Sequence, residues 1–297
     1  MTSPFSTLPG RKLLDSLREI FTNKKIYQRQ DRFIVFVCGG KEENSFRQQF
    51  IDWAQTNLPE FICIKAEDAL MDSFAGEGRT FTNLTTFESI IASISDCVLI
   101  FPESAGSYAE VGVFATNSEI SVKTLVVNPY ELQPEPSFLN HGPIDTIDRK
   151  SFLKVLSIKY DIADFVMIRQ HLLHSVKWPN HRERISHKTF GKFTFKEKLF
   201  VVFETLRFLR LADEKTLRQV IVYCFGGNPQ YQELRQLLRI LQAGKFIERN
   251  ESYFKVIPGM NLTEIEHLEV ETVFLQFNYF YQHNSPELYK VLHEVAK

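Results

Sequence analysis

The stretch 101–115, FPESAGSYAEVGVFA, decides the fold class of this 297-residue chain. It continues the apolar run CVLIF at 97–101, which predicts a buried strand. The small, polar residues 102–107 predict a loop, and the amphipathic stretch after them predicts a helix with Glu110 about one turn from its start. In open α/β sheets, ligands bind where strands end and helices begin, and helix N-termini attract negative charge. Glu110 is therefore either a charge that satisfies the helix dipole or a catalytic carboxylate.

Strands and helices alternate on both sides of this stretch. Short β-rich runs are separated by segments whose apolar residues recur at helical spacing, and most of the links are short. This alternation predicts a parallel sheet covered by helices on both faces. The predicted strands lie at 32–37, 61–64, 97–101 and 124–127, and the predicted helices at 12–21, 43–56, 84–94, 147–158 and 166–174.

The pattern changes after about residue 193. Amphipathic helices are predicted at 195–211, 214–225 and 230–243, followed by a β-hairpin around 250–252 and more helix from 262 to 295. Three helices followed by a hairpin is the order of a winged-helix domain. Basic side chains on the third helix and around the hairpin are candidates for contact with nucleic acid or a protein partner. They are Arg235, Arg239, Lys245, Arg249 and Lys255.

These patterns divide the chain into three parts. We expect an α/β domain over residues 1–160, a helical and basic linker over 161–192 and a winged-helix domain over 193–297. Residues 1–150 contain 14 Lys and Arg against 20 Asp and Glu, whereas residues 151–297 contain 21 against 16. The acidic front half argues against nucleic acid lying over it, and the basic rear half leaves that possibility open.

Composition also indicates the cellular setting. The four cysteines have no C-x-x-C spacing, and three of them lie in or beside apolar runs, which is typical of buried thiols in a reducing compartment. No apolar run approaches the length of a membrane-spanning helix, and the opening segment 1–10 lacks a signal-peptide pattern. We therefore expect a cytoplasmic protein with no membrane segment, and no metal site.

Two glycine-containing turns flank the expected ligand crevice. Residues 38–40 (CGG) end the first strand, but they lack the G-x-G-x-x-G and G-K-[ST] patterns, so neither a dinucleotide cofactor nor NTP hydrolysis is supported. Residues 106–110 (GSYAE) form a G-[ST]-x-x-E pattern in the context described above. A glutamate near a helix start is, taken alone, more often a dipole-satisfying residue, whereas the glycine and hydroxyls beside this one favour a binding site.

Five spaced segments make the sequence resemble a known family. The G-S-x-x-E pattern resembles that of the nucleoside 2-deoxyribosyltransferases, and more narrowly the chain is similar to the effectors of type II retrons, which carry such an N-glycosidase-like domain. The similarity covers residues 33 to about 145, and beyond them only the architecture agrees. The matching segments are FVCGG at 36–40, EDALMD at 67–72, FAGEG at 74–78, FPESAGSYAEVG at 101–112 and SFLNHGP at 137–143.

The resemblance implies a flavodoxin/Rossmann-like doubly wound sheet and cleavage of an N-glycosidic bond. The family's motif glutamate attacks C1′ of a nucleoside, so Glu110 is the expected catalytic residue. NAD is an expected substrate rather than a cofactor, because its nicotinamide leaving group is already cationic and needs no proton. The expected substrate-binding residues are Cys38, Gly39, Gly40, Asp68, Asp72, Gly76, Arg79, Ser104, Gly106, Ser107 and Asn140.

One departure from the transferases favours hydrolysis over base exchange. Where those enzymes commonly place an Asp two residues before the glycine, this chain has Ser104. The retron resemblance further implies, as partners, the reverse transcriptase and its msDNA (an RNA–DNA hybrid), and an oligomer or higher assembly. Two alternatives stay open: a nucleotide-sensing domain fused to a winged-helix transcription regulator, and a metabolic nucleoside deoxyribosyltransferase.

Overall fold

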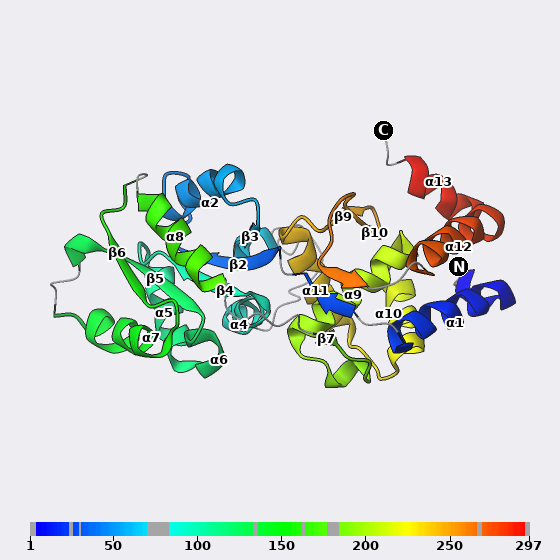
Figure 1. Ribbon diagram of the computed structural model, residues 1–297, viewed down its shortest axis with the longest axis horizontal. Helices are drawn as coiled ribbons and strands as arrows, with labels where there is room; N and C mark the ends of the chain where they lie inside the picture. The colour runs from blue at the N-terminus through cyan, green and yellow to red at the C-terminus, as the bar shows by residue number, and fades with distance from the viewer. Residues whose placement is uncertain are drawn as a thin grey trace. The chain divides into compact units, whose positions relative to one another are not determined.

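The computed structural model describes residues 4–23, 26–29, 31–69, 83–132, 136–161, 164–176, 184–265 and 269–294. The chain forms two compact units (Figure 1). The α/β unit is Asp31–His181, and the winged-helix unit combines Met1–Gln30 with Arg182–Lys297. The chain thus leaves the winged-helix unit once and later returns to it, so the α/β unit is an insertion.

This division differs from the expected one at two places. The segment Met1–Gln30 belongs to the winged-helix unit and not to the α/β domain expected over 1–160. The stretch expected as a linker, 161–192, contributes to both cores: Phe165 is buried in the α/β unit and Phe190 in the winged-helix unit. Their apolar side chains explain the difference, because a solvated linker leaves no such rings buried.

Five parallel strands form the sheet of the α/β unit, in the order β3-β2-β4-β5-β6. In chain order this is 2-1-3-4-5, the flavodoxin-like arrangement, and the doubly wound sheet predicted above is confirmed. The strands are nearly continuous apolar runs because both faces of the sheet are covered. They are β2 (Phe33–Cys38), β3 (Phe61–Ile64), β4 (Cys97–Ile100), β5 (Thr124–Pro129) and β6 (Val155–Ile158).

Helices cover the two faces of this sheet (Figure 1). Phe50 of α2 and Phe165 of α8 pack on the face that includes Phe101, while Phe114 of α5 packs against Phe36 on the opposite face. Each ring buried in this way contributes about 1.5–3 kcal/mol to stability. The helices are α2 (Phe46–Asn57), α4 (Leu84–Ile94), α5 (Ala105–Thr116), α6 (Ser118–Ser121), α7 (Asp145–Lys150) and α8 (Phe165–Val176).

The helix predicted over 147–158 is wrong beyond residue 150. Helix α7 ends at Lys150, and β6 takes the edge of the sheet beside β5. Lys154, between them, has a φ of 61°, which a continuous right-handed helix does not allow. Ile147 of α7 and Ile158 of β6 are both buried, so this stretch contributes to the core from two different elements.

The winged-helix unit has the element order that the sequence predicts. Thr194 and Glu197 form a capping box at the start of α9, and Asp213 caps α10. A short strand after α9 joins the hairpin in a sheet of order β8-β10-β9. The elements are α9 (Phe195–Leu209), β8 (Ala212–Asp213), α10 (Glu214–Phe225), α11 (Tyr231–Ala243), β9 (Ile247–Asn250) and β10 (Tyr253–Val256).

Both ends of the chain complete this unit. Phe21 of α1 packs against Phe225 of α10, and Phe5 stacks on Phe280 of α12. Strand β1 lies between β7 and β11 in a second, antiparallel sheet. These elements are α1 (Leu8–Asn23), β1 (Ile26–Gln28), β7 (Arg184–Ile185), β11 (Thr263–Ile265), α12 (Glu269–Asn284) and α13 (Pro286–Glu294). Across the described ranges, no helix has the length and apolar character to span a bilayer.

Candidate active site

A cavity of about 750 Å³ opens beyond the carboxyl ends of β2 and β4. These strands are neighbours, with Cys38 in register with Ile100, yet the chain continues from them to helices on opposite faces of the sheet. Such a switch point leaves a crevice between the two connections, and it is where open α/β sheets bind ligands. The position that the sequence suggests for a ligand site is therefore hollow.

The helix on one side of the cavity, α5, begins with a capping box at Ser104. Ser104 Oγ accepts the Ser107 N–H at 3.2 Å, and Ser107 Oγ accepts the Ser104 N–H at 2.9 Å. Both residues line the cavity, but their hydroxyls are also committed to holding the start of α5. Their first function is thus to fix the helix that carries Glu110.

Replacing Ser104 by alanine is expected to lower the free energy of unfolding by about 1 kcal/mol, because the first turn of α5 loses its cap. Urea denaturation of the full chain measures this change. Ser89→Ala is the control, since that hydroxyl only donates to Thr85 O within α4, and it is expected to change stability by less than about 0.5 kcal/mol. Equal losses in the two variants would contradict the capping role.

Glu110 lies in the second turn of α5 and lines the cavity. Its Oε2 atom is buried and, within the described part of the chain, has no hydrogen-bond partner. The thiol of Cys38, at the end of β2, hydrogen-bonds the carboxylate. Burial, followed by the negative charge of Glu88, raises the pKa of Glu110 to about 7. A half-protonated carboxylate with a free oxygen in a cavity is typical of a catalytic group.

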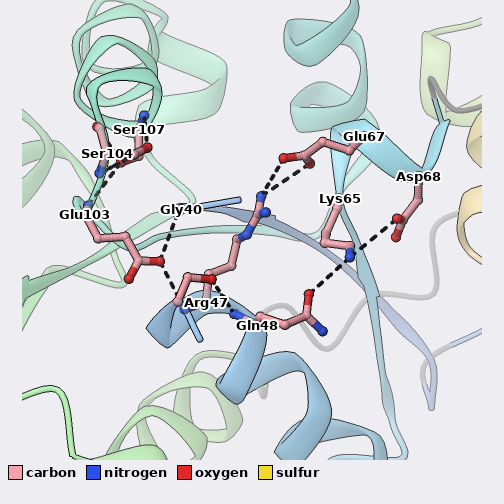
Figure 2. Close-up of polar contacts among 10 residues, drawn as sticks. Gly40, Arg47, Gln48, Lys65, Glu67, Asp68, Glu103, Ser104 and Ser107 are labelled. Carbon is pink, nitrogen blue, oxygen red and sulfur yellow. Dashed lines mark hydrogen bonds and ion pairs between the residues drawn. The ribbon is translucent and has the colours of Figure 1, made fainter. Parts of the chain in front are cut away.

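Besides Glu110, four glutamates are among the described residues that line the cavity, and sequence reasoning predicted none of them as a site residue: Glu42, Glu67, Glu88 and Glu103. Glu88 comes from α4, where burial and then Glu67 raise its pKa. Glu67 follows β3, and its Oε1 atom is 3.1 Å from Nη1 of Arg47, a side chain that is only 6% exposed (Figure 2). A signal for Glu88 was present, because it occupies a buried-face position of the 84–94 helix beside Phe87 and Ile91.

The carboxylate of Glu103 connects the two sides of the crevice. Its Oε1 accepts the N–H groups of Gly40 at 2.9 Å and Arg47 at 3.1 Å (Figure 2). Its Oε2 accepts the N–H group of Phe46 at 2.9 Å. Residues 46 and 47 are the first two of α2, so a carboxylate from the end of β4 caps the helix that follows β2.

The glycines beside Glu103 make room for it. A Cβ atom on Gly39 would lie 2.8 Å from Glu103 Oε1, and one on Gly40 would lie 3.3 Å from Glu103 Cδ. On Gly106, by contrast, a Cβ atom would lie 3.8 Å from Ser104 Oγ, so no atom of the described residues requires glycine there. Of the predicted glycines that the structure describes, Gly106 is the one whose surroundings leave space for close approach by a ligand.

Comparison with known proteins places the chain in a family. A family model described as STM3845 retron effector protein matches residues 43–249, which include parts of both units. The chain belongs to this retron effector family. The resemblance drawn from the five sequence segments is thereby confirmed.

Two Escherichia coli proteins are similar to this retron effector. The "Retron Ec86 putative ribosyltransferase/DNA-binding protein" is 24% identical over 252 residues, covering 78% of the effector and 79% of that relative. The "Retron Ec73 putative ribosyltransferase/DNA-binding protein" is 29% identical over 121 residues, covering 39% and 38% respectively.

The effector brings some, but not all, of the predicted site residues together. Gly39, Gly40, Ser104, Gly106, Ser107 and Glu110 line the cavity. Cys38 is buried behind it, in contact with Glu110. Asp68 is instead turned to Lys65, 3.5 Å from its Nζ (Figure 2), and Asn140 lies beside Asn128 at 3.4 Å. Neither is among the described residues that line the cavity, and Asp72, Gly76 and Arg79 lie outside the described residues.

The predicted basic residues of the effector lie on α11 and the hairpin. Arg235 of α11 pairs with Glu214 at 2.8 Å, and Arg249 of β9 lies over the ring of Phe254. Arg239 follows one turn after Arg235 on α11, Lys245 lies between α11 and β9, and Lys255 lies opposite Glu248 in the hairpin. Acidic neighbours thus offset part of the positive charge that the sequence suggests for this face.

Proposed function

We propose that this retron effector cleaves the N-glycosidic bond of NAD or a related nucleotide at the α/β unit, with Glu110 as the catalytic carboxylate. The observation that carries the proposal is the buried Oε2 atom of Glu110, which has no hydrogen-bond partner among the described residues and lies in a cavity at the switch point of the sheet. A charged oxygen left without a partner is costly unless a ligand supplies one, and an electron-poor ribosyl C1′ is such a ligand.

The chemistry needs little beyond this carboxylate. The bond between C1′ and the nicotinamide nitrogen breaks, and its electron pair leaves with the base, which becomes neutral without gaining a proton. Glu110 either forms an ester bond to C1′ or stabilises the oxocarbenium-like state electrostatically. Water then adds a hydroxyl group to C1′ and releases a proton; in the covalent route this breaks the ester bond, whose electron pair returns to the Glu110 carboxylate. The raised pKa of Glu110 leaves about half of it ionised near pH 7, so the nucleophilic form is available.

The neighbouring residues support hydrolysis rather than base exchange. The hydroxyl of Ser104, at the position where the transferases commonly have an Asp, is committed to the α5 cap and provides no acid for a purine. Glu67 and Glu88 face the same cavity and are suited to accept hydrogen bonds from ribose hydroxyls. Arg47 holds Glu67 in place, so its role is positioning.

The winged-helix unit is the proposed site for retron partners. Three helices and a hairpin present Arg239, Lys245 and Lys255 on one small module, which suits a surface that binds the reverse transcriptase with its msDNA. In this proposal the effector acts as a toxin in antiphage defence, within a higher assembly, and the partner complex restrains or activates the α/β unit.

The test is incubation of the effector, assembled with reverse transcriptase and msDNA, with NAD under activating conditions. Chromatography is expected to show free nicotinamide and ADP-ribose with the parent protein. Glu110→Gln is expected to release neither, whereas Glu119→Gln, which changes an exposed glutamate outside the cavity, should behave as the parent. Intact NAD and intact nucleotides with the parent assembly would overturn the proposal.

A further inference from the structure

The head of α2 is where a nucleotide phosphate is expected in a sheet of this type. Phosphates bind at the N-terminus of the helix that follows the first strand of the switch point, because free N–H groups and the helix dipole point at them. In this chain Gly39 and Gly40 supply the tight turn, and α2 follows it. The position therefore has the fold context of a phosphate site.

The N–H groups at this helix head are already bonded within the protein. Those of Arg47 and Gly40 donate to Glu103 (Figure 2), and that of Phe46 also donates to Glu103. The other two N–H groups of the first turn of α2, those of Ser45 and Gln48, are bonded within the preceding loop. Ser45 N–H donates to Glu42 O at 2.9 Å, and Gln48 N–H donates to Ser45 Oγ at 3.2 Å. None of the four donors that an α-helix leaves free at its start is available for a phosphate oxygen.

The space beside Gly39 and Gly40 is occupied by the carboxylate of Glu103. A side chain on Gly39 would collide with both Glu103 Oε1 and the Cβ atom of Arg47, at 2.8 and 2.7 Å. Glycine is thus needed there to admit Glu103, and its presence does not indicate close approach by a substrate phosphate. A phosphate at this position would also meet the negative charge of Glu103 directly.

The charge of the cavity points the same way. Besides Glu103, the described residues that line it include Glu42, Glu67, Glu88 and Glu110, and a single cation, Lys41. Glu42 is exposed, whereas burial desolvates Glu88 and Glu110. Together these carboxylates favour a cationic group and disfavour the two negative charges of a pyrophosphate.

We propose that Glu103 is a specificity-determining residue that takes the place of a substrate phosphate at the head of α2. The site therefore recognises a ribosyl group attached to a cationic base, and any phosphates of the substrate remain outside this helix head. An N-ribosylpyridinium without phosphate belongs to the substrate class on equal terms with the dinucleotide. This inference rests on the proposed function and specifies which part of the nucleotide is bound.

The first test measures binding of nicotinamide riboside, nicotinamide mononucleotide and NAD by calorimetry to the full-length Glu110→Gln effector, assembled with reverse transcriptase and msDNA under activating conditions; this variant avoids turnover. We expect dissociation constants within about tenfold of one another. If NAD binds a hundredfold or more tightly than the riboside, the inference is overturned while the proposed function stands. If none of the three binds, the proposed function fails, and the inference fails with it.

The second test uses inorganic pyrophosphate and does not depend on cleavage. Glu103→Ala uncovers the N–H groups of Phe46 and Arg47, so this variant is expected to bind pyrophosphate at least tenfold more tightly than the parent. Glu43→Ala removes an equal charge from an exposed position near α2 that does not line the cavity, and should change binding less than threefold. If the Glu103→Ala variant folds and binds pyrophosphate no more tightly than the parent, the inference is overturned. If the variant does not fold, the first test decides whether the inference holds.

Discussion

Replacing Glu110 by glutamine is expected to lower turnover of NAD by the activated effector at least about a thousandfold, because the variant keeps the shape of the side chain but loses the charge that meets C1′. The rate of nicotinamide release by the retron assembly measures this effect. Glu119→Gln is the matched control. A loss of less than tenfold would mean that Glu110 is not the catalytic carboxylate.

The same variant should not be less stable than the parent. The folded-state pKa of Glu110 is raised from 4.5 to about 7, so the charged form is disfavoured by folding. Its destabilising effect is absent below pH 4.5, grows as the pH rises toward 7 and is constant above. Urea denaturation at pH 8 is therefore expected to show equal or greater stability for Glu110→Gln, which separates lost chemistry from lost folding.

The rate of NAD cleavage is expected to rise with pH through about 7 and to be about a hundredfold lower at pH 5 than at its plateau, since only ionised Glu110 attacks. The groups that set this midpoint are known from the structure. Burial and the charges of Glu88 and Glu67 raise the pKa of Glu110, whereas the Cys38 hydrogen bond and Arg47 lower it. A pH profile of kcat/KM, taken at NAD concentrations well below KM, measures this midpoint because it reports the pKa of the free enzyme.

Glu88→Gln tests whether the pKa of Glu110 sets the midpoint of the pH profile, whatever the effect of the substitution on the plateau rate. Because the charge of Glu88 is the second-largest cause of the raised pKa, its removal is expected to move the midpoint to lower pH. Glu119→Gln should leave the midpoint unchanged. A midpoint that stays fixed or moves upward in Glu88→Gln would show that another group controls the profile.

Local sequence signals were sufficient for most of the fold. Continuous apolar runs identified β2, β3, β4 and β5, and helical periodicity identified their connecting helices and the winged-helix order. The short strands of the second, antiparallel sheet were missed, because β1 is very short and pairs with β11, which lies close to the other end of the chain. The membership of Met1–Gln30 in the winged-helix unit depends on that pairing and on α1 packing, and neither leaves a local trace.

The candidate site was predictable only in part, for a related reason. Glu110 could be found because its position depends on one strand and the helix directly after it. The functions of Glu103 and Arg47 depend instead on contacts between distant residues. Glu103 accepts hydrogen bonds from residues at least 56 positions away, and Arg47 pairs with Glu67, which is 20 positions away. The acidic segment at 67–72 was recognised, but which of its carboxylates faces the cavity is set by the end of β3, and Glu67 faces it where Asp68 was expected.

The insertion of the α/β unit has a consequence for the order of events on the ribosome. The enzyme-like unit is complete once residue 181 has been synthesised, but β1 cannot complete its sheet until β11 arrives at residue 265. At ordinary translation rates this interval is on the order of 10 s. During it a folded cavity with Glu110 exists while the winged-helix unit is unfinished. Under the proposed function, a cell that makes this effector therefore gains from having the restraining partner complex present before each new chain is released.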